Sequence, residues 1–214
     1  MPLALDFYQK SLKTVSEGDA KMKGILNFQI GFLLLEQSFY KEAIPYFKNS
    51  LAMEKLLNDS LMTAYVLQKI AYAYQEEKND SCLIYYNMAL RIAKETGNKG
   101  LNDEILSSLA TYYIDCRNYS KAKSYAMPII SHMDPDDPAM ASFLYVAATA
   151  FRMLGERGSS AYYYHRLGEL KSIEAKTEAY LNLFKIYRTG NNADKAFEYF
   201  INPPPKKKYI YIYG

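Results

Sequence analysis

The segments EAIPYFKNSL, at residues 42–51, and SCLIYYNMAL, at residues 81–90, decide the fold of this chain. Each has a small residue at its second position and an aromatic residue at its sixth. Related segments recur along the sequence, and their small position holds Ala4, Ala43, Cys82, Ala122, Ser160 and Ala196. The successive spacings of 39, 39, 40, 38 and 36 residues indicate an internal repeat. The chain is therefore predicted to be an array of similar units.

A second series of positions precedes each small residue by eleven or twelve places. It holds Gly31, Ala71, Ala110, Ala148 and Phe184, and a bulky residue follows three places later, at Leu34, Tyr74, Tyr113, Phe151 and Tyr187. Spacings of three and four mark one face of an α-helix, so each period predicts two amphipathic helices. Small side chains let two helices approach closely, and we expect these positions to mark the helix crossings. A single pair cannot bury its apolar face, which favours stacking of the units.

Charge and hydropathy exclude several classes of protein. The 26 basic and 23 acidic residues include Lys206, Lys207 and Lys208 near the C-terminus, so the remainder of the chain is formally neutral. A neutral body lacks the positive surface of a nucleic-acid-binding protein. The longest apolar stretch, residues 25–35, is far shorter than the roughly 20 residues that cross a bilayer. We expect no membrane span, and no signal peptide is apparent.

Residues that carry chemistry are few. The chain has two histidines and two cysteines, and no metal-ligand spacing joins them. Cys82 occupies a small-residue position, where a thiol packs as alanine would. His165 is expected to be a solvated imidazole or to lie at the edge of a groove. The sequence contains no Gly-rich phosphate loop and no nucleophile elbow. We predict a protein that is not an enzyme and that has no metal and no cofactor.

The repeat resembles that of tetratricopeptide repeat (TPR) proteins, in particular the roughly 40-residue repeats of bacterial regulatory and sensor proteins. The resemblance implies an all-α fold, a right-handed α-α superhelix of antiparallel helix pairs. It covers residues 1–202 as a single solenoid, followed by an irregular Pro/Lys/Tyr tail at residues 203–214. The solenoid is expected to consist of a trailing half-repeat at 3–17 and helix pairs at 22–57, 61–97, 101–133, 138–172 and 175–202.

In TPR folds the first helix of each pair lines a concave groove, and the resemblance carries this role to specific positions. The candidate peptide-binding residues are Gln68, Tyr72, Gln75, Ser107, Thr111, Tyr145, Thr149, Arg152, Lys185 and Arg188. The last three are basic, so a peptide with an acidic segment is the expected partner. Ordinary solvated helix faces are the alternative interpretation of the same residues.

Phe28, Phe32 and Leu35 form an apolar stripe on the first complete unit. An exposed stripe of this kind predicts a partner or a second copy of the chain, and hence a possible homo-oligomer.

The leading hypothesis is a non-catalytic scaffold that binds a protein or peptide, in a regulatory role in bacteria. The alternative is a ligand-sensing fragment of a larger bacterial transcriptional or two-component regulator without its output domain. We expect a cytoplasmic protein for the chain as written, and a periplasmic one if it is a fragment of a larger sensor.

Overall fold

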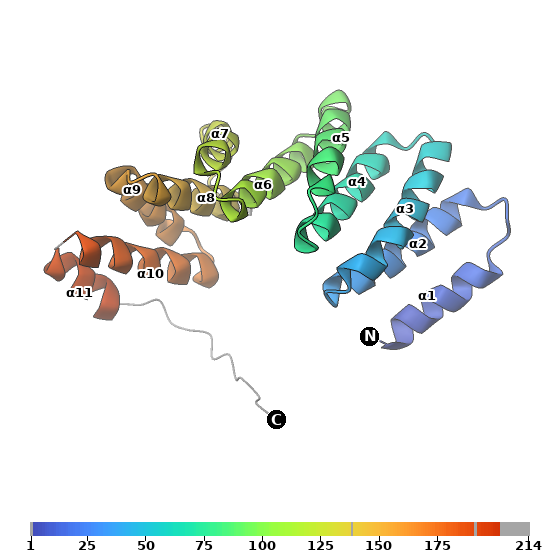
Figure 1. Ribbon diagram of the computed structural model, residues 1–214, viewed down its shortest axis with the longest axis horizontal. Helices are drawn as coiled ribbons and strands as arrows, with labels where there is room; N and C mark the ends of the chain where they lie inside the picture. The colour runs from blue at the N-terminus through green and yellow to red at the C-terminus, as the bar shows by residue number, and fades with distance from the viewer. Residues whose placement is uncertain (1, 138, 191, 202–214) are drawn as a thin grey trace. The chain divides into compact units, whose positions relative to one another are not determined.

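The computed structural model describes residues 2–137, 139–190 and 192–201. Within these ranges the chain forms eleven α-helices and no β-strand, which confirms the predicted all-α fold (Figure 1). The helices are α1 (Pro2–Thr14), α2 (Ala20–Glu36), α3 (Tyr40–Leu56), α4 (Ser60–Glu76), α5 (Ser81–Glu95), α6 (Lys99–Asp115), α7 (Tyr119–Ile130), α8 (Met140–Met153), α9 (Arg157–Glu169), α10 (Ile173–Thr189) and α11 (Ala193–Ile201). The predicted irregular tail lies outside the described residues.

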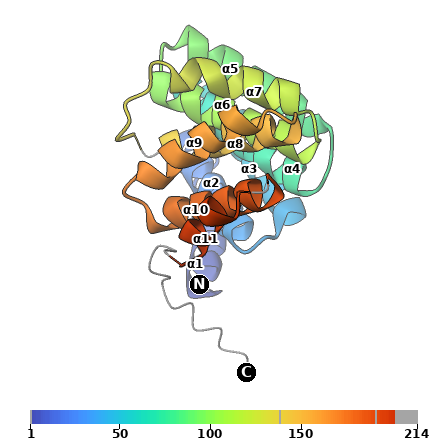
Figure 2. The same ribbon diagram turned by 90° about the vertical axis from the view of Figure 1, so that its left-hand side faces the viewer.

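The helices pack in chain order within two compact units. Unit 1 extends to Ser108, and in it α1 packs on α2, α2 on α3, α3 on α4 and α4 on α5. Unit 2 begins at Leu109 and contains the consecutive contacts from α7 to α11. Two views show these neighbouring helices lying side by side within each unit (Figures 1 and 2). We call α2, α4, α6, α8 and α10 first helices, and α3, α5, α7, α9 and α11 second helices. A single solenoid over residues 1–202 stays a prediction.

The small-residue positions are buried at the helix crossings, as predicted. Ala43, Cys82, Ala122 and Ser160 are completely buried on the second helices, and so are Ala71, Ala110 and Ala148 on the first helices. Gly31 allows the closest approach, because a Cβ atom placed on it would lie 2.9 Å from the ring of Phe47. The aromatic residues Phe47, Tyr86 and Tyr164 are also completely buried. The repeat in the sequence is therefore a packing signature.

The turns between helices share one local geometry. Ser38, Asn58, Lys78 and Arg117 have positive φ angles between 53° and 63°, and Gly155 has a φ of 82°. In each turn the next residue donates its backbone N–H to the carbonyl five positions earlier, as from Phe39 to Leu34 at 2.9 Å. This is the backbone pattern of the Schellman motif, which satisfies carbonyls that the helix end leaves free. The same turn thus reverses the chain at five places.

Stacked aromatic pairs join the helices of four consecutive hairpins. The ring centroids lie 5.4 Å apart for Tyr74–Tyr85, 5.6 Å for Tyr113–Tyr125, 5.3 Å for Phe151–Tyr163 and 5.7 Å for Tyr187–Tyr199. A lysine lies over the first ring of each pair, at Lys48, Lys121, Lys123 and Lys195 respectively, 4.6–5.4 Å from the centroid. Offset stacking and cation–π contacts each contribute roughly 0.5–1.5 kcal/mol, so the pairs strengthen every hairpin that has one.

Candidate functional site

The first helices of unit 1 carry a strip of aromatic rings. Phe28 on α2 lies 6.2 Å from Phe32, 5.7 Å from the buried Phe47 and 5.6 Å from Tyr65 on α4, measured between ring centroids. Phe28, Phe32 and Leu35 are each half-buried. The predicted apolar stripe is therefore partly covered within its own unit by Tyr65. This weakens the reason for expecting a second copy of the chain, and the homo-oligomer stays a prediction.

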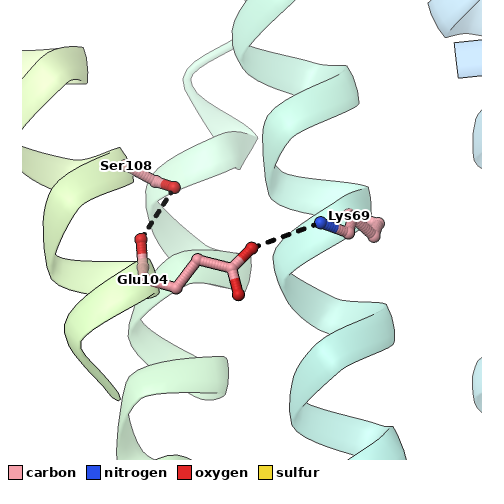
Figure 3. A network of polar contacts seen from close by, with 3 residues as sticks. All are labelled: Lys69, Glu104 and Ser108. Carbon is pink, nitrogen blue, oxygen red and sulfur yellow. Dashed lines mark hydrogen bonds and ion pairs between the residues drawn. The ribbon is translucent and has the colours of Figure 1, made fainter. Parts of the chain in front are cut away.

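A polar network continues the strip from α4 to α6 (Figure 3). The Lys69 ammonium lies 3.4 Å from Oε1 of Glu104 and 4.5 Å from the centroid of the Tyr65 ring. The Lys69 side chain is only 16% exposed, whereas that of Glu104 is 50% exposed. The hydroxyl of Ser108 donates to the backbone carbonyl of Glu104 at 3.1 Å. The Glu104 carboxylate is thus held at the surface beside an aromatic face.

The predicted residues of α4 take up different environments. Tyr72 is 36% exposed, but Gln68 is only 3% exposed, and its Oε1 has no hydrogen-bond partner among the described residues. Gln75 is half-buried and accepts a hydrogen bond of 2.9 Å from the hydroxyl of Tyr86. Burial raises the pKa of the Tyr72 hydroxyl, with a further contribution from the charge of Glu76. Only Tyr72 of the three presents a substantial open surface.

The predicted residues of α8 in unit 2 show a similar combination. Tyr145 is 37% exposed, whereas Thr149 is 5% exposed and lies 2.9 Å from the Tyr164 hydroxyl, oxygen to oxygen. Arg152 is half-buried, and its Nε is buried without a hydrogen-bond partner in the described part of the chain. Burial raises the pKa of Tyr164, while Thr149 and Arg152 lower it. The Arg152 Nε–H, unpaired among the described residues, thus lies two helical turns along α8 from the exposed Tyr145.

The remaining candidates lie on two other first helices. Ser107 on α6 is half-buried and Thr111 on the same helix is exposed. Lys185 and Arg188 on α10 are both exposed, and the Arg188 guanidinium lies 5.5 Å from the centroid of the Phe184 ring. Phe184 is the one large residue in the small-residue series of the first helices. It is half-buried, and its ring contacts the guanidinium of Arg188.

Sequence reasoning missed Tyr65 and Lys69, which the structure adds to the unit 1 strip. Both lie on the same face of α4 as Tyr72, seven and three residues before it. Helical periodicity could therefore have predicted that the three side chains share one face. Their contacts with Phe28 on α2 and Glu104 on α6 join residues 37 and 35 positions apart in the chain. No local pattern predicts such contacts.

Two further observations bear on chemistry. Within the described ranges, no group of three or more His, Cys, Asp or Glu side chains is placed to hold a metal ion. None of the helices found there is long and apolar enough to cross a membrane.

The fold is that of TPR-like helical repeat proteins. No protein-family model and no curated protein matches the sequence. Among solved structures, BtubC (BKLC) from P. vanneervenii is similar with a TM-score of 0.80 at 14% identity, over 96% of this chain and 93% of that one. The nearly identical TPR-like repeats of a Podosopora anserina kinesin light chain are also similar to this chain. The TM-score is 0.69 at 12% identity, over 87% of this chain and 94% of that one.

A Rap protein complexed with competence and sporulation factor is also similar. Its TM-score is 0.67 at 18% identity, and the likeness covers 92% of this chain and 56% of the Rap chain. Identities this low show a common fold, and function has to be argued from the site.

Proposed function

We propose that the chain is a non-catalytic scaffold that binds a protein or peptide through the exposed faces of its first helices. The observation that carries the proposal is shared by α4 and α8. Each exposes a tyrosine to about the same extent, Tyr72 at 36% and Tyr145 at 37%. The two tyrosines offer open aromatic surface, and the half-buried Arg152 on α8 adds a guanidinium that can donate to a ligand.

A polypeptide ligand matches both requirements. Its side chains can pack on the exposed rings of Tyr72 and Tyr145, and its carboxylates can accept from the Arg152 guanidinium, which is the donor best suited to that geometry. Lys185 and Arg188 add positive charge on α10 of the same unit. This supports an acidic segment in a ligand of unit 2. Taken by itself, the aromatic strip of Phe28, Phe32 and Tyr65 in unit 1 suits an apolar segment. The Rap protein complexed with competence and sporulation factor is a precedent for ligand binding by this fold.

Peptide selection from a random displayed library tests the proposal. We expect the wild-type protein to enrich peptides with Asp or Glu residues, and Arg152→Gln to bind those peptides at least about tenfold more weakly, a loss of about 1.4 kcal/mol. Lys185→Glu and Arg188→Glu are expected to weaken binding further through the lost attraction. Arg91→Glu is the control, because Arg91 is exposed on the second helix α5 and its reversal changes the net charge equally.

Thermal unfolding followed by circular dichroism establishes that each variant is folded. Enrichment of no peptide, or equal affinity of the selected peptides for wild type and Arg152→Gln, would contradict the proposal.

A second candidate function is the sensing segment of a larger regulator. The likeness spans 56% of the Rap chain, which supports it. A reading frame that continues into a DNA-binding or kinase domain would favour this candidate, and expression of the 214 residues as an independent product would count against it.

A further inference from the structure

Unit 2 contains a cavity whose described lining residues include none from α8. It has a volume of about 580 Å³ and lies between the second helix α9, the C-terminal end of α10 and the residue that precedes α11. The residues that matter for its chemistry are Arg157, Gly158, Tyr162, His165, Tyr187 and Asn192. Pockets of roughly 300–1,000 Å³ hold small ligands or the end of a peptide, so the cavity is large enough for specific binding.

The cavity is open because α9 presents small residues to it. The face of α9 that lines the cavity carries two small residues, Gly158 and Ala161, together with Arg157, Tyr162 and His165. A Cβ atom placed on Gly158 would meet no other atom within 4 Å. Gly158 is the second residue of α9, so the first turn of the helix has no side chain at this point of the cavity lining. A larger side chain at Gly158 would enter the cavity without a clash.

The charges at the cavity favour an anion. Arg157 is the permanently charged residue in its lining, and no carboxylate is found among the described residues that line it. The Lys195 ammonium lies 5.3 Å from the centroid of the Tyr187 ring and adds positive charge nearby. Burial and the charge of Lys195 lower the pKa of His165 by more than Glu169 and Glu198 raise it. A carboxylate on the ligand would therefore be drawn toward Arg157.

His165 forms a fixed part of the wall. Its Nε2 lies 3.3 Å from the hydroxyl oxygen of Tyr187 on α10 and 3.2 Å from that of Tyr199 on α11. Burial lowers the pKa of His165, and the positive charge of Lys195 lowers it further, which favours the neutral imidazole. The expectation of a solvated imidazole holds for its exposed edge but missed these two contacts. The ring therefore links three helices next to the cavity.

Flat aromatic surfaces complete the lining. Tyr162 is 57% exposed and meets Tyr163 edge to face, with centroids 5.0 Å apart. Tyr187 is stacked on Tyr199 with an angle of 4° between the rings, which holds it in place. Aromatic side chains recognise other aromatic groups by stacking or edge contacts. Together with Arg157, they define a site with one cationic end and two ring walls.

We propose that this cavity binds a carboxylate carried on an aromatic body. Arg157 pairs with the carboxylate, and Tyr162 and Tyr187 contact the aromatic group. The ligand is either a free aromatic acid or the last residue of a polypeptide, because both present the same chemistry. The site is built from second-helix residues and the end of α10, so it does not depend on the function proposed for the first-helix faces.

Nuclear magnetic resonance of the full protein tests the proposal with 3-phenylpropionate as the probe. The protein has only two histidines, so His165 and His132 give two imidazole Hε1 signals. We expect the probe to shift the His165 signal and the amide signals of Gly158 and Gly190, and to leave His132 unchanged. A bound carboxylate also favours the imidazolium, so the pKa of His165 should rise when the probe is present. The neutral 3-phenylpropanamide should bind at least about tenfold more weakly.

Two variants separate loss of the site from loss of the fold. Arg157→Gln removes the charge and should abolish the preference for the acid over the amide. Gly158→Leu fills the cavity and should eliminate binding of both probes, while the melting temperature stays about equal because a Cβ at this position meets no other atom within 4 Å. Equal binding of acid and amide by the wild type, or binding that survives Gly158→Leu in a folded protein, would overturn the proposal.

The source of the ligand follows from a second pair of probes. Acetyl-Gly-Gly-Phe with a free carboxylate is compared with 3-phenylpropionate, and its amidated form serves as the control. Tighter binding of the free peptide assigns the C-terminus of a polypeptide to the cavity, and tighter binding of 3-phenylpropionate assigns a free aromatic acid. Failure of both acids to bind overturns the proposal, and it leaves the peptide selection on Arg152 unaffected.

Discussion

Unit 1 and unit 2 repeat the same helix hairpin but present different chemistry on their first helices. In unit 1 the strip of Phe28 and Tyr65 ends at Lys69, whose charge is paired with Glu104. In unit 2 the Nε of Arg152 has no hydrogen-bond partner among the described residues. Buried repeat positions must fit their neighbours, while exposed positions are free to differ. The repeat therefore determines the packing and leaves the binding chemistry of each unit open.

The two units also fill their helix crossings differently. In the α2–α3 pair, Gly31 leaves room for the ring of Phe47, which would lie 2.9 Å from a Cβ at that position. The matching positions of the α6–α7 pair are Ala110 and Ala126, and both are completely buried. A large residue opposite glycine and two alanines are alternative ways to fill the same crossing. Substitutions at these positions test whether the two crossings are equivalent.

The largest expected effect comes from giving each unit the residue that the other unit has at the matching position of the second helix. Phe47→Ala removes a completely buried ring and should lower the free energy of unfolding by about 3–5 kcal/mol. Ala126→Phe adds a ring at a completely buried alanine and should lower it by about 1–3 kcal/mol through overpacking. Urea unfolding followed by circular dichroism measures both changes. Hydrogen exchange is expected to show the loss of protection in unit 1 for the first variant and in unit 2 for the second.

A smaller loss for Phe47→Ala than for Ala126→Phe would mean that Phe47 is not the residue on which the crossing depends.

An intermediate effect is expected when unit 1 is given the alanine found in unit 2. Gly31→Ala should lower the free energy of unfolding by about 1–3 kcal/mol, because the new methyl group meets the Phe47 ring. In the Phe47→Ala background the same change should be neutral, or stabilising by up to about 1 kcal/mol from helix propensity. A double-mutant cycle of urea unfolding measures the coupling. Additive effects would show that the glycine is not required by the ring.

The smallest effect concerns a buried carboxyl group in unit 1. Glu54 is 5% exposed, whereas the matching position in unit 2 is the buried Met133. Burial raises the pKa of Glu54 above its usual value of 4.5, and the charge of Asp59 raises it further. The folded state then binds the proton more tightly than the unfolded state does. The stability that Glu54 contributes is therefore fully present below pH 4.5 and is lost as the pH rises through the raised pKa.

Glu54→Gln should therefore raise the free energy of unfolding at pH 7, by less than about 1 kcal/mol, and leave it unchanged at about pH 4. Melting temperatures measured at both pH values provide the test. Glu54→Met, which copies unit 2, is expected to stabilise at least as much at pH 7. A loss of stability at pH 7 in both variants would show that the carboxylate is favourably hydrogen-bonded.

The sequence predicted the elements of the fold because the repeat positions are constrained locally. Small residues at the crossings and the aromatic residues four positions later were sufficient to predict helix pairs. The stacked partners of the hairpins went unnoticed, although the signal was present. The third position after each small residue of the series is aromatic in every case, at Phe7, Tyr46, Tyr85, Tyr125, Tyr163 and Tyr199.

The candidate sites were less accessible to sequence reasoning. Gln68 and Thr149 were expected on the lining of a groove, but both side chains are buried, because small changes in helix rotation decide between a surface position and a buried one. Tyr65 and Lys69 were missed because their partners lie on other helices. His165 was visible in the sequence only as one residue in a run of aromatic ones.

The sequence by itself determined the all-α repeat, the helix crossings and the scarcity of chemical groups, because each depends on residue type and local spacing. Only the tertiary structure decided which side chains meet across helices. It shows the Lys69–Glu104 pair in unit 1 and, among the described residues of unit 2, the unpaired Nε of Arg152 and the cavity beside His165. Contacts of this kind depend on the rotation and distance of neighbouring helices. These quantities are fixed by the packing of the whole core, to which many residues distant in sequence contribute.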